Sequence, residues 1–279
     1  AGAINIWADS DSNGSGGIMV NNNTTFDSRT SADRTATTHT TGGGSITLAG
    51  GADDGGTASG TSSLTTGMVA SDGIPDGYAV NSGSLAAQTG IVLGTSTAAT
   101  GQNANVNFYS GGGHIRLLGK VTNNTSNPAS GPTAIQAFHG HTLNAGTNGD
   151  IIFIGNADLT SGLWAIGMDL AAWRNTSYTA NGTLRTVNGN IHIIGRATGG
   201  PSGNLAIAVD GTTGNRNIFA ATGSGTITFD GLASGASITD CRLTNTDLLA
   251  ASGDIQVIGQ SSGGLSISNW IGDGLYVGQ

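Results

Sequence analysis

The chain has 279 residues, a formal net charge of −8 at pH 7 and a charged fraction of only 9%. This balance leaves no basic surface of the kind that binds nucleic acid or anionic membranes. No run of about 18 apolar residues is present, so we expect no membrane span. Glycine accounts for 49 residues and all 17 acidic residues are Asp, a composition that favours sharp turns over helices.

A seven-residue phrase, Gly-x-Ile-x-[Leu/Phe/Ile/Val]-x-Gly, recurs along the chain. An imperfect copy spans residues 2–8, and full copies begin at Gly44, Gly113, Gly149, Gly189, Gly225 and Gly253. Alternating apolar residues between glycines indicate a short strand with one buried face. Because such a strand cannot bury that face alone, we expect stacked coils of a right-handed parallel β-helix, an all-β β-solenoid. With irregular coils of about 20 residues, about 14 coils would form a rod on the order of 65 Å long.

The organisation along the chain is a single β-helix over residues 1–279. Two stretches, 51–89 and 122–147, are poor in apolar pattern and are expected to be loop-rich excursions. A shortened phrase over residues 90–94 restores the rhythm between them. The best helix candidate is residues 167–174, which would form a short cap or insertion.

The phrase also predicts which side chains face the core. The inward pairs are Ile115 with Leu117, Ile151 with Phe153, Ile191 with Ile193, Ile227 with Phe229 and Ile255 with Val257. Strict alternation turns the next residue outward, yet it is Leu118, Ile154, Ile194 and Ile258 in four copies. Either the strand bends at the following glycine and returns this side chain to the core, or a neighbouring element covers an aliphatic row. We favour the bend, because glycine follows every time.

Two segments carry a family likeness: INIWADSDSNGSGGI at residues 4–18 and TTGGGSITL at residues 40–48. They resemble the shaft repeats of large filamentous-haemagglutinin-like exoproteins of Gram-negative bacteria, many of which are adhesins exported by two-partner secretion. The resemblance is concentrated in residues 1–50 and covers the rest as a style of repeat. It implies a long right-handed β-helix that projects from the cell surface.

One metal site is suggested by the residues themselves. Asp9, Asp11 and Asn13, followed by Gly14, match the first half of a calcium loop, whose short side chains surround one cation with hard oxygens. The twelfth position of that loop is Val20 rather than Glu, so only a partial calcium site is expected, and no other cofactor. The alternative is a turn in which Asp and Asn bond their own backbone. His114, His139 and His141 have no second ligand cluster at metal spacing and read as surface turn residues.

An enzyme on the same fold is the main alternative. Pectin hydrolases of β-helical fold use Asp carboxylates for acid and base chemistry, together with a Gly-His-Gly motif and a basic motif. Here Asp53 and Asp54 come first, the His139–His141 stretch follows, and Asn245-Thr246-Asp247 comes last. The order differs from that of the hydrolases and the basic motif is absent, so no catalytic residues are assigned.

The sequence therefore predicts a structural shaft of a bacterial cell-surface adhesin or extracellular fibre, possibly a repeating filament subunit, and not an enzyme. The expected location is secreted or on the surface of a Gram-negative bacterium. Strand phrases near both ends predict end-to-end continuation with the same polypeptide or with identical subunits, and a host or matrix receptor is a further expected partner. The alternative function is a polysaccharide-active enzyme or a carbohydrate-binding β-helix.

Overall fold

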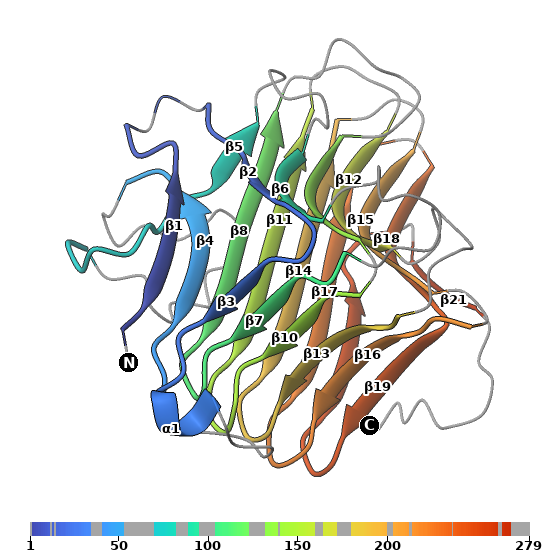
Figure 1. The fold of residues 1–279 in the computed structure, drawn as a ribbon. Coiled ribbons are helices and arrows are strands. Elements are labelled where there is room, and N and C mark those ends of the chain that lie inside the picture. Colours follow the sequence, from blue (N-terminus) through green and yellow to red (C-terminus); the bar gives the residue numbers. More distant parts are fainter. Residues whose placement is uncertain are drawn as a thin grey trace.

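The computed structural model describes residues 2–11, 13, 15–34, 41–52, 70–81, 89–94, 104–122, 132–138, 140–159, 164–171, 180–199, 203–211, 214–235, 237–261 and 264–268. These residues form an all-β, right-handed parallel β-helix with three sheets around one axis, as predicted (Figure 1). The described helix content is one turn, α1 (Ser31–Arg34). None of the helices in this part of the chain has the length and apolar character to cross a membrane.

Sheets A and B take strands from all seven described turns of the chain, and sheet C takes one from each of the first six. Sheet A contains, in spatial order, β1 (Ile4–Ala8), β4 (Ile46–Gly50), β8 (Ile115–Thr122), β11 (Ile151–Asp158), β14 (Ile191–Thr198), β17 (Ile227–Ala233) and β20 (Ile255–Gly259), and the short β5 (Ala79–Asn81) pairs with β8. Sheet B contains β2 (Ile18–Val20), β6 (Thr89–Leu93), β9 (Thr133–Ala137), β12 (Ala165–Ala171), β15 (Asn204–Asp210), β18 (Ile238–Thr244) and β21 (Leu265–Ser268). Sheet C contains β3 (Thr25–Asp27), β7 (Asn107–Tyr109), β10 (Thr142–Asn144), β13 (Gly182–Thr186), β16 (Asn217–Ala221) and β19 (Thr246–Ala250).

The recurring phrase marks one full turn of the helix, which we call a rung. Ile151 lies opposite Ile115 on one side and Ile191 on the other, and Ile191 lies opposite Ile227. These register partners are 36, 40 and 36 residues apart in sequence. The expected coil of about 20 residues is therefore too short, because each turn carries three strands and their connections. The seven strands along sheet A span six intervals, about 29 Å at the usual strand spacing.

The core is a column of aliphatic and aromatic side chains between the three sheets. The inward pairs predicted from the phrase are confirmed: those of β8, β11, β14 and β17 have no exposed surface. Ile255 and Val257 of the last sheet A strand face the same core but are only partly buried. Phe219 from sheet C meets Phe229 from sheet A edge to face, with ring centroids 5.0 Å apart.

The glycines that close the phrase lie where sheet A passes close to sheet B. A Cβ atom on Gly155 would stand 2.1 Å from the carbonyl oxygen of Gly167, and one on Gly195 would stand 2.1 Å from the carbonyl oxygen of Ala206. Both distances are far below contact, so only glycine fits while the two backbones keep this spacing. Small residues continue the packing beyond this row, where Ala157 and Ala197 meet Ala165 and Ala206.

The strands do not bend at these glycines. Strands β8, β11 and β14 run straight through Gly119, Gly155 and Gly195, so the predicted return of the preceding side chain to the core is wrong. Instead, Leu118, Ile154 and Ile194 form a separate outer cluster with Ala49 and Ile152, against which Tyr78 packs. The covering element is therefore part of the same chain. The corresponding Ile258 in the last rung is 39% exposed.

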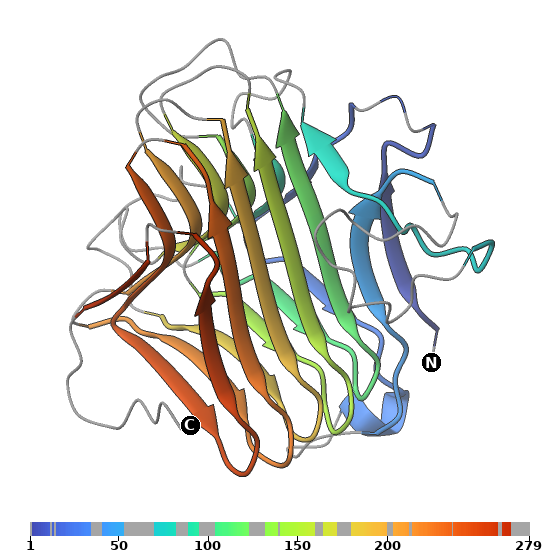
Figure 2. The ribbon, with the colours of Figure 1, turned by 180° about the vertical axis from the view of Figure 1, so that it is seen from behind.

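Tyr78, which packs against this outer cluster, follows an insertion within one strand position of sheet A. Strand β4 pairs with the first half of β8, and β5 pairs with the second half, so residues 51–78 interrupt a single strand row. In Figure 2, β5 lies beside β8 at the end of the sheet away from α1. The returning chain is held by paired backbone hydrogen bonds between Gly50 and Gly77, 2.8 and 3.1 Å long. The insertion accounts for the 69-residue separation of Ile46 and Ile115.

The expected helix and the two expected loop-rich excursions contain strands in their described parts. The helix candidate at residues 167–174 is wrong over its described part, since residues 167–171 belong to strand β12, whose side chains Met168 and Leu170 are buried in the core. Within the expected excursions, β5 lies in 51–89, and β9 and β10 lie in 122–147 as regular members of their sheets. Residues 53–69, 82–88, 123–131 and 139 of these stretches lie outside the described residues.

Candidate functional site

The most regular constellation of polar side chains is a ladder at the start of sheet A. The second residue of each phrase lies in the turn before the strand, and in four phrases its backbone N–H donates to the side chain of the equivalent residue one rung earlier. The bonds run from His114 N to Ser45 Oγ (3.1 Å), Asp150 N to His114 Nδ1 (3.1 Å), Asn190 N to Asp150 Oδ1 (2.7 Å) and Thr226 N to Asn190 Oδ1 (2.9 Å). We call this series the corner ladder.

The corner ladder explains a pattern that the sequence analysis overlooked. The second phrase position is Ser45, His114, Asp150, Asn190, Thr226 and Asp254, and every one of these side chains can accept a hydrogen bond close to the backbone. A turn between parallel strands leaves backbone N–H groups without ladder partners, and an acceptor on a short side chain satisfies them. The shared chemistry, rather than residue identity, was the signal.

The ladder contains one ionisable contact. His114 Nδ1 accepts from the Asp150 N–H when unprotonated, and when protonated it can donate to Asp150 Oδ2, 3.3 Å away. Burial acts to raise the pKa of Asp150, but contacts with His114 and with the Asn190 amide outweigh it and hold that pKa below its ordinary value. Burial lowers the pKa of the nearby His192. These groups serve the packing of adjacent rungs.

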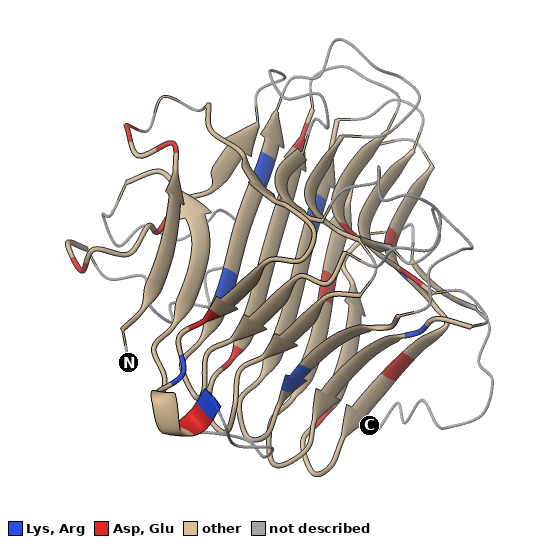
Figure 3. Ribbon diagram, in the orientation of Figure 1, with Lys and Arg blue, Asp and Glu red and all other residues tan. Residues whose placement is uncertain are grey.

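Charged side chains are also joined from rung to rung. Arg196 bonds Asp230 (3.2 Å), Arg242 bonds Asp210 (2.5 Å), Arg216 bonds Asp247, and Lys120 lies 3.7 Å from Asp158. Figure 3 shows basic and acidic positions scattered along the ribbon. Each pair joins neighbouring strands or their flanking turns. The three arginine pairs are largely buried, whereas Asp158 is 56% exposed, so the Lys120 pair contributes only about 0–1 kcal/mol. All four pairs help to fix the register of neighbouring rungs.

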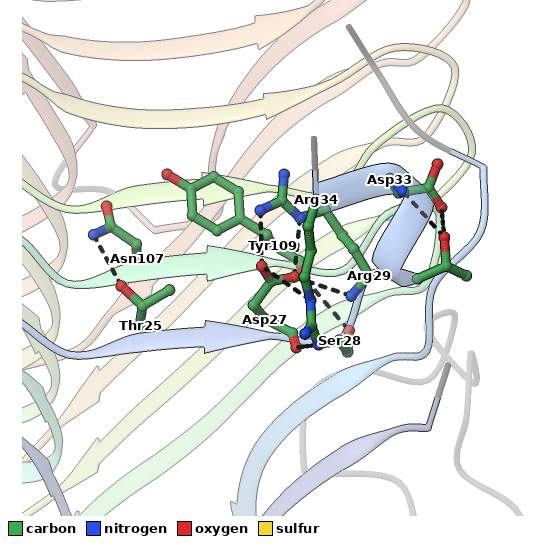
Figure 4. Close-up of polar contacts among 9 residues, drawn as sticks. Thr25, Asp27, Ser28, Arg29, Asp33, Arg34, Asn107 and Tyr109 are labelled. Atoms are coloured by element: carbon green, nitrogen blue, oxygen red, sulfur yellow. Dashed lines mark hydrogen bonds and ion pairs between the residues drawn. The ribbon is translucent and has the colours of Figure 1, made fainter. Parts of the chain in front are cut away.

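A second polar cluster holds the turn that leads from sheet C of the first rung to sheet A of the second (Figure 4). Asp27 accepts from Arg29 Nε (2.9 Å) and Nη2 (2.8 Å), and the Arg29 guanidinium lies over the Tyr109 ring, 4.4 Å from its centroid. The side-chain hydrogen bond from Arg29 lowers the pKa of Asp27 despite its burial. At the start of α1, Thr30 Oγ1 accepts from the Asp33 N–H (3.2 Å), which caps the turn. The cluster ties the first rung to the second.

A buried carboxylate closes the last described turn between sheets A and B. Asp240 is fully buried and accepts from Ala233 N (2.8 Å), Ser261 N (2.9 Å) and Ser261 Oγ (2.7 Å). Three donors make a buried carboxylate tenable without a counter-ion. Its position within the packing, with no exposed surface, gives it a structural role.

The predicted calcium residues lie together in the turn after β1. The Asn13 amide donates to Asp11 Oδ2 (2.7 Å), and Asn13 Oδ1 accepts from the Ser15 N–H (3.0 Å). Asp9 has a left-handed backbone, with φ of 53°. These bonds match the Asx-turn alternative, in which the side chains satisfy their own backbone. The described residues contain no group of three or more His, Cys, Asp or Glu that could hold a metal ion. Calcium binding by Asp9, Asp11 and Asn13 stays a prediction.

The other singled-out residues are dispersed. His141 is buried before β10, with Nδ1 2.9 Å from the Phe138 carbonyl oxygen, so its expected position at the surface is wrong, whereas His114 lies in the corner ladder before β8. Asn245 bonds the Gly211 carbonyl oxygen (2.9 Å), and Asp247 pairs with Arg216. His139, Asp53, Asp54, Trp173 and Trp270 lie outside the described residues. The described parts of the pectin-hydrolase comparison therefore do not converge on one cleft.

The described tryptophans lie apart from one another, and the cysteine is a core residue. Trp7 lies on β1 and donates to the Gly51 carbonyl oxygen (2.8 Å), while Trp164 precedes β12 and covers Gly203. The two indoles are separated by several rungs and do not line a common groove. Cys241 is fully buried, and burial raises its thiol pKa to about 12, so it acts as a core residue.

Comparisons with family models, with curated proteins and with solved structures found no match to this chain.

Proposed function

We propose that this chain is a structural shaft segment of an extracellular fibre or cell-surface adhesin of a Gram-negative bacterium, and that it has no catalytic role. The observation that carries the proposal is the corner ladder together with the in-register core. Polar and charged side chains are used to join one rung to the next along the axis. Because these side chains bond between rungs, they oppose separation of the rungs and so make the helix stiff along its axis.

The physical basis is nearest-neighbour stacking. In a solenoid each rung contacts only its neighbours, so resistance to opening depends on the strength of every rung-to-rung interface. Here the four interfaces between the second and sixth rungs combine backbone ladder bonds in three sheets, a buried apolar column and a side-chain bond at the corner. The resemblance to filamentous-haemagglutinin-like shafts supports the same proposal, as does the surface location that it implies. End-to-end continuation with further rungs, and a host or matrix receptor, belong to it.

Protease resistance tests the shaft proposal. We expect the strands of sheets A, B and C to survive prolonged digestion under native conditions, because cleavage needs an extended segment released from three ladders. Asn190→Ala, which removes one ladder acceptor, should be cut faster than Asn190→Ser, which keeps an acceptor on a short side chain. Peptide mapping of the wild-type digest that placed early cuts within the sheet A strands would contradict the proposal.

The alternative polysaccharide function has its own readout. Incubation with pectic, neutral and acidic polysaccharides should release no reducing ends and should not retard the chain on gels that contain these polymers. Release of reducing ends would replace the shaft proposal with an enzymatic one.

Antibodies against the folded chain should label unpermeabilised cells of the organism that encodes it, and exclusively intracellular labelling would contradict the proposed location.

A further inference from the structure

Among the described residues, the partly buried side chains of the main core lie at the two ends of the helix. The partly buried apolar residues packed against the main core are Ile4, Ile6, Ala8 and Phe26 in the first rung, and Ala250, Ile255 and Val257 in the last strands of sheets C and A. Their counterparts in the middle rungs are fully covered by a rung on each side. In the first rung this incomplete burial lies in sheets A and C, because Ile18 and Val20 of β2 in sheet B are only 7% and 4% exposed.

Exposed large apolar side chains gather at the same two ends. Trp7 (37% exposed) and Met19 (49%) lie in the first rung, while Leu249 (46%), Ile258 (39%) and Leu265 (45%) lie in the last described strands of sheets C, A and B. Among the described residues, one further side chain of this kind, Trp164 (49%), lies in the middle of the helix. Exposed apolar surface concentrated in this way marks an interaction site.

The two ends are complementary in register. Stacking β20 of one copy on β1 of another, with the phrases aligned as they are inside the chain, places Ile255 over Ile4 and Val257 over Ile6. The same alignment brings the exposed Ile258 over the exposed Trp7. In sheet B the inward row runs through Ile18, Ile91, Ile135, Met168, Ile207, Cys241 and Leu265. The next member of that row would be Ile18 of the second copy, which would cover Leu265.

The two ends also carry complementary hydrogen-bonding groups at the turn before sheet A. Inside the chain, the Ile227 N–H donates to the Asp254 carbonyl oxygen (2.9 Å), and the Asn190 N–H donates to Asp150 Oδ1 (2.7 Å). Asp254 is the second residue of the last phrase, its side chain is exposed, and its carboxylate has no hydrogen bond from the described residues. In the aligned stack the Ala3 N–H of the second copy would donate to this carboxylate, and the Ile255 N–H would donate to the Ala3 carbonyl oxygen.

We propose that this chain assembles head to tail with a second copy of itself, the rung of β20 and β21 stacking on the rung of β1 and β2 so that sheets A and B continue across the junction. The inference rests on the proposed shaft function and deepens it by naming the partner and the register. The contact joins two different surfaces, so the assembly is open-ended rather than a closed dimer. The interface continues the rung-to-rung contacts already present inside the chain.

The test blocks one end at a time. A charged side chain on an edge strand opposes pairing, so Trp7→Lys should block the first rung and Ile258→Lys the last. At up to about 100 μM the wild type should form oligomers of increasing size, and each variant alone should associate roughly tenfold or more weakly. Mixed in equal amounts, the two variants each retain one competent end, so they should form dimers and stop there. Trp164→Lys, an equally exposed position in the middle of the helix, should associate like the wild type.

A cross-linking measurement covers the case in which a lysine variant fails to fold. Asn5→Cys with Gln256→Cys places two outer-face cysteines about 4.8 Å apart across the proposed junction, within disulfide reach, but about 29 Å apart within one chain. Oxidation should give a covalent series of oligomers. The control pair Asn5→Cys with Gln260→Cys is displaced four residues along the strand and should remain monomeric.

Three outcomes would overturn the head-to-tail assembly: a wild-type chain that stays monomeric, a variant mixture that fails to form dimers, or Trp164→Lys that weakens association as much as the end variants. None of these outcomes would contradict the shaft proposal, because its protease test is made on the single chain. Conversely, a chain that oligomerised as described but released reducing ends from a polysaccharide would refute the shaft and leave the junction intact.

Discussion

Replacing the closing glycine of one phrase by alanine tests how the sheets pack. In the Gly195→Ala variant the new Cβ would lie 2.1 Å from the Ala206 carbonyl oxygen and 2.5 Å from Ile207 Cγ1. Ordinary contact begins at about 3.4 Å, so sheets A and B would have to separate by about 1.3 Å at this rung. Overpacking of this kind typically costs 1–3 kcal/mol, and a backbone obstacle places the change near the top of that range, about 3 kcal/mol.

The matched control is Gly214→Ala, where a Cβ would meet nothing within 4 Å. That change should be neutral or should stabilise the protein by about 0.4–1 kcal/mol, because alanine restricts the unfolded chain. Urea denaturation of the two variants and the wild type gives the difference, which we expect to be about 3–4 kcal/mol. A difference below about 0.5 kcal/mol would show that the repeated glycine does not report close approach of the sheets.

Three further predictions concern the core, the ladder and pH. Ile191→Ala should lower the free energy of unfolding by about 2–5 kcal/mol through lost burial and a cavity, whereas Ile255→Ala in the partly buried last rung should cost less; equal losses in urea denaturation would contradict the assigned burial. Asn190→Ala removes an acceptor for both Thr226 N and Thr226 Oγ1, each 2.9 Å away, and should cost about 1–2 kcal/mol, while Asn190→Ser recovers part of it; identical denaturation midpoints would count against the corner ladder. Burial raises the pKa of Cys241 from 9.0, and that of Tyr78 from 10.0, to about 12, so the unfolded chain releases these protons at lower pH than the folded chain. The free energy of unfolding should therefore be unchanged below about pH 9 and fall towards pH 12. Cys241→Ala should reduce this fall, and denaturation curves measured over a series of pH values would check it.

The sequence was informative wherever one side chain determined one contact. Alternating residues such as Ile151 and Phe153 had to share a face, and the repetition of the phrase required stacking, so the fold and the inward rows were predictable. The length of a turn was not, because strands such as β7 and β10 are three residues long and carry no phrase of their own, so their spacing does not mark the turn. The predicted turn was about half as long as the 36 to 40 residues observed.

Contacts between distant segments were the harder part. The bend predicted at Gly155 was wrong. Glycine is needed there because a Cβ atom would stand 2.1 Å from the Gly167 carbonyl oxygen in sheet B, a contact that no local sequence pattern reveals. The cover over Ile154 comes in part from Tyr78, across an insertion in a different rung. Residues 167–171 have apolar spacing compatible with a helix, yet parallel pairing on both sides selects strand β12. Tertiary pairing overrides local preference in such segments.

The most direct test of the architecture is a disulfide between equivalent phrase positions of adjacent rungs. His192 and Thr228 are register partners on the outer face of sheet A although they are 36 residues apart in sequence. If each phrase marks one turn, their Cα atoms lie about 4.8 Å apart, and His192→Cys with Thr228→Cys should oxidise to an intramolecular bond. Turns of about 20 residues would insert another rung and separate these atoms by about 9.6 Å, beyond disulfide reach. Formation of the bond in the folded monomer is the predicted result, and two free thiols after oxidation under native conditions would contradict the account.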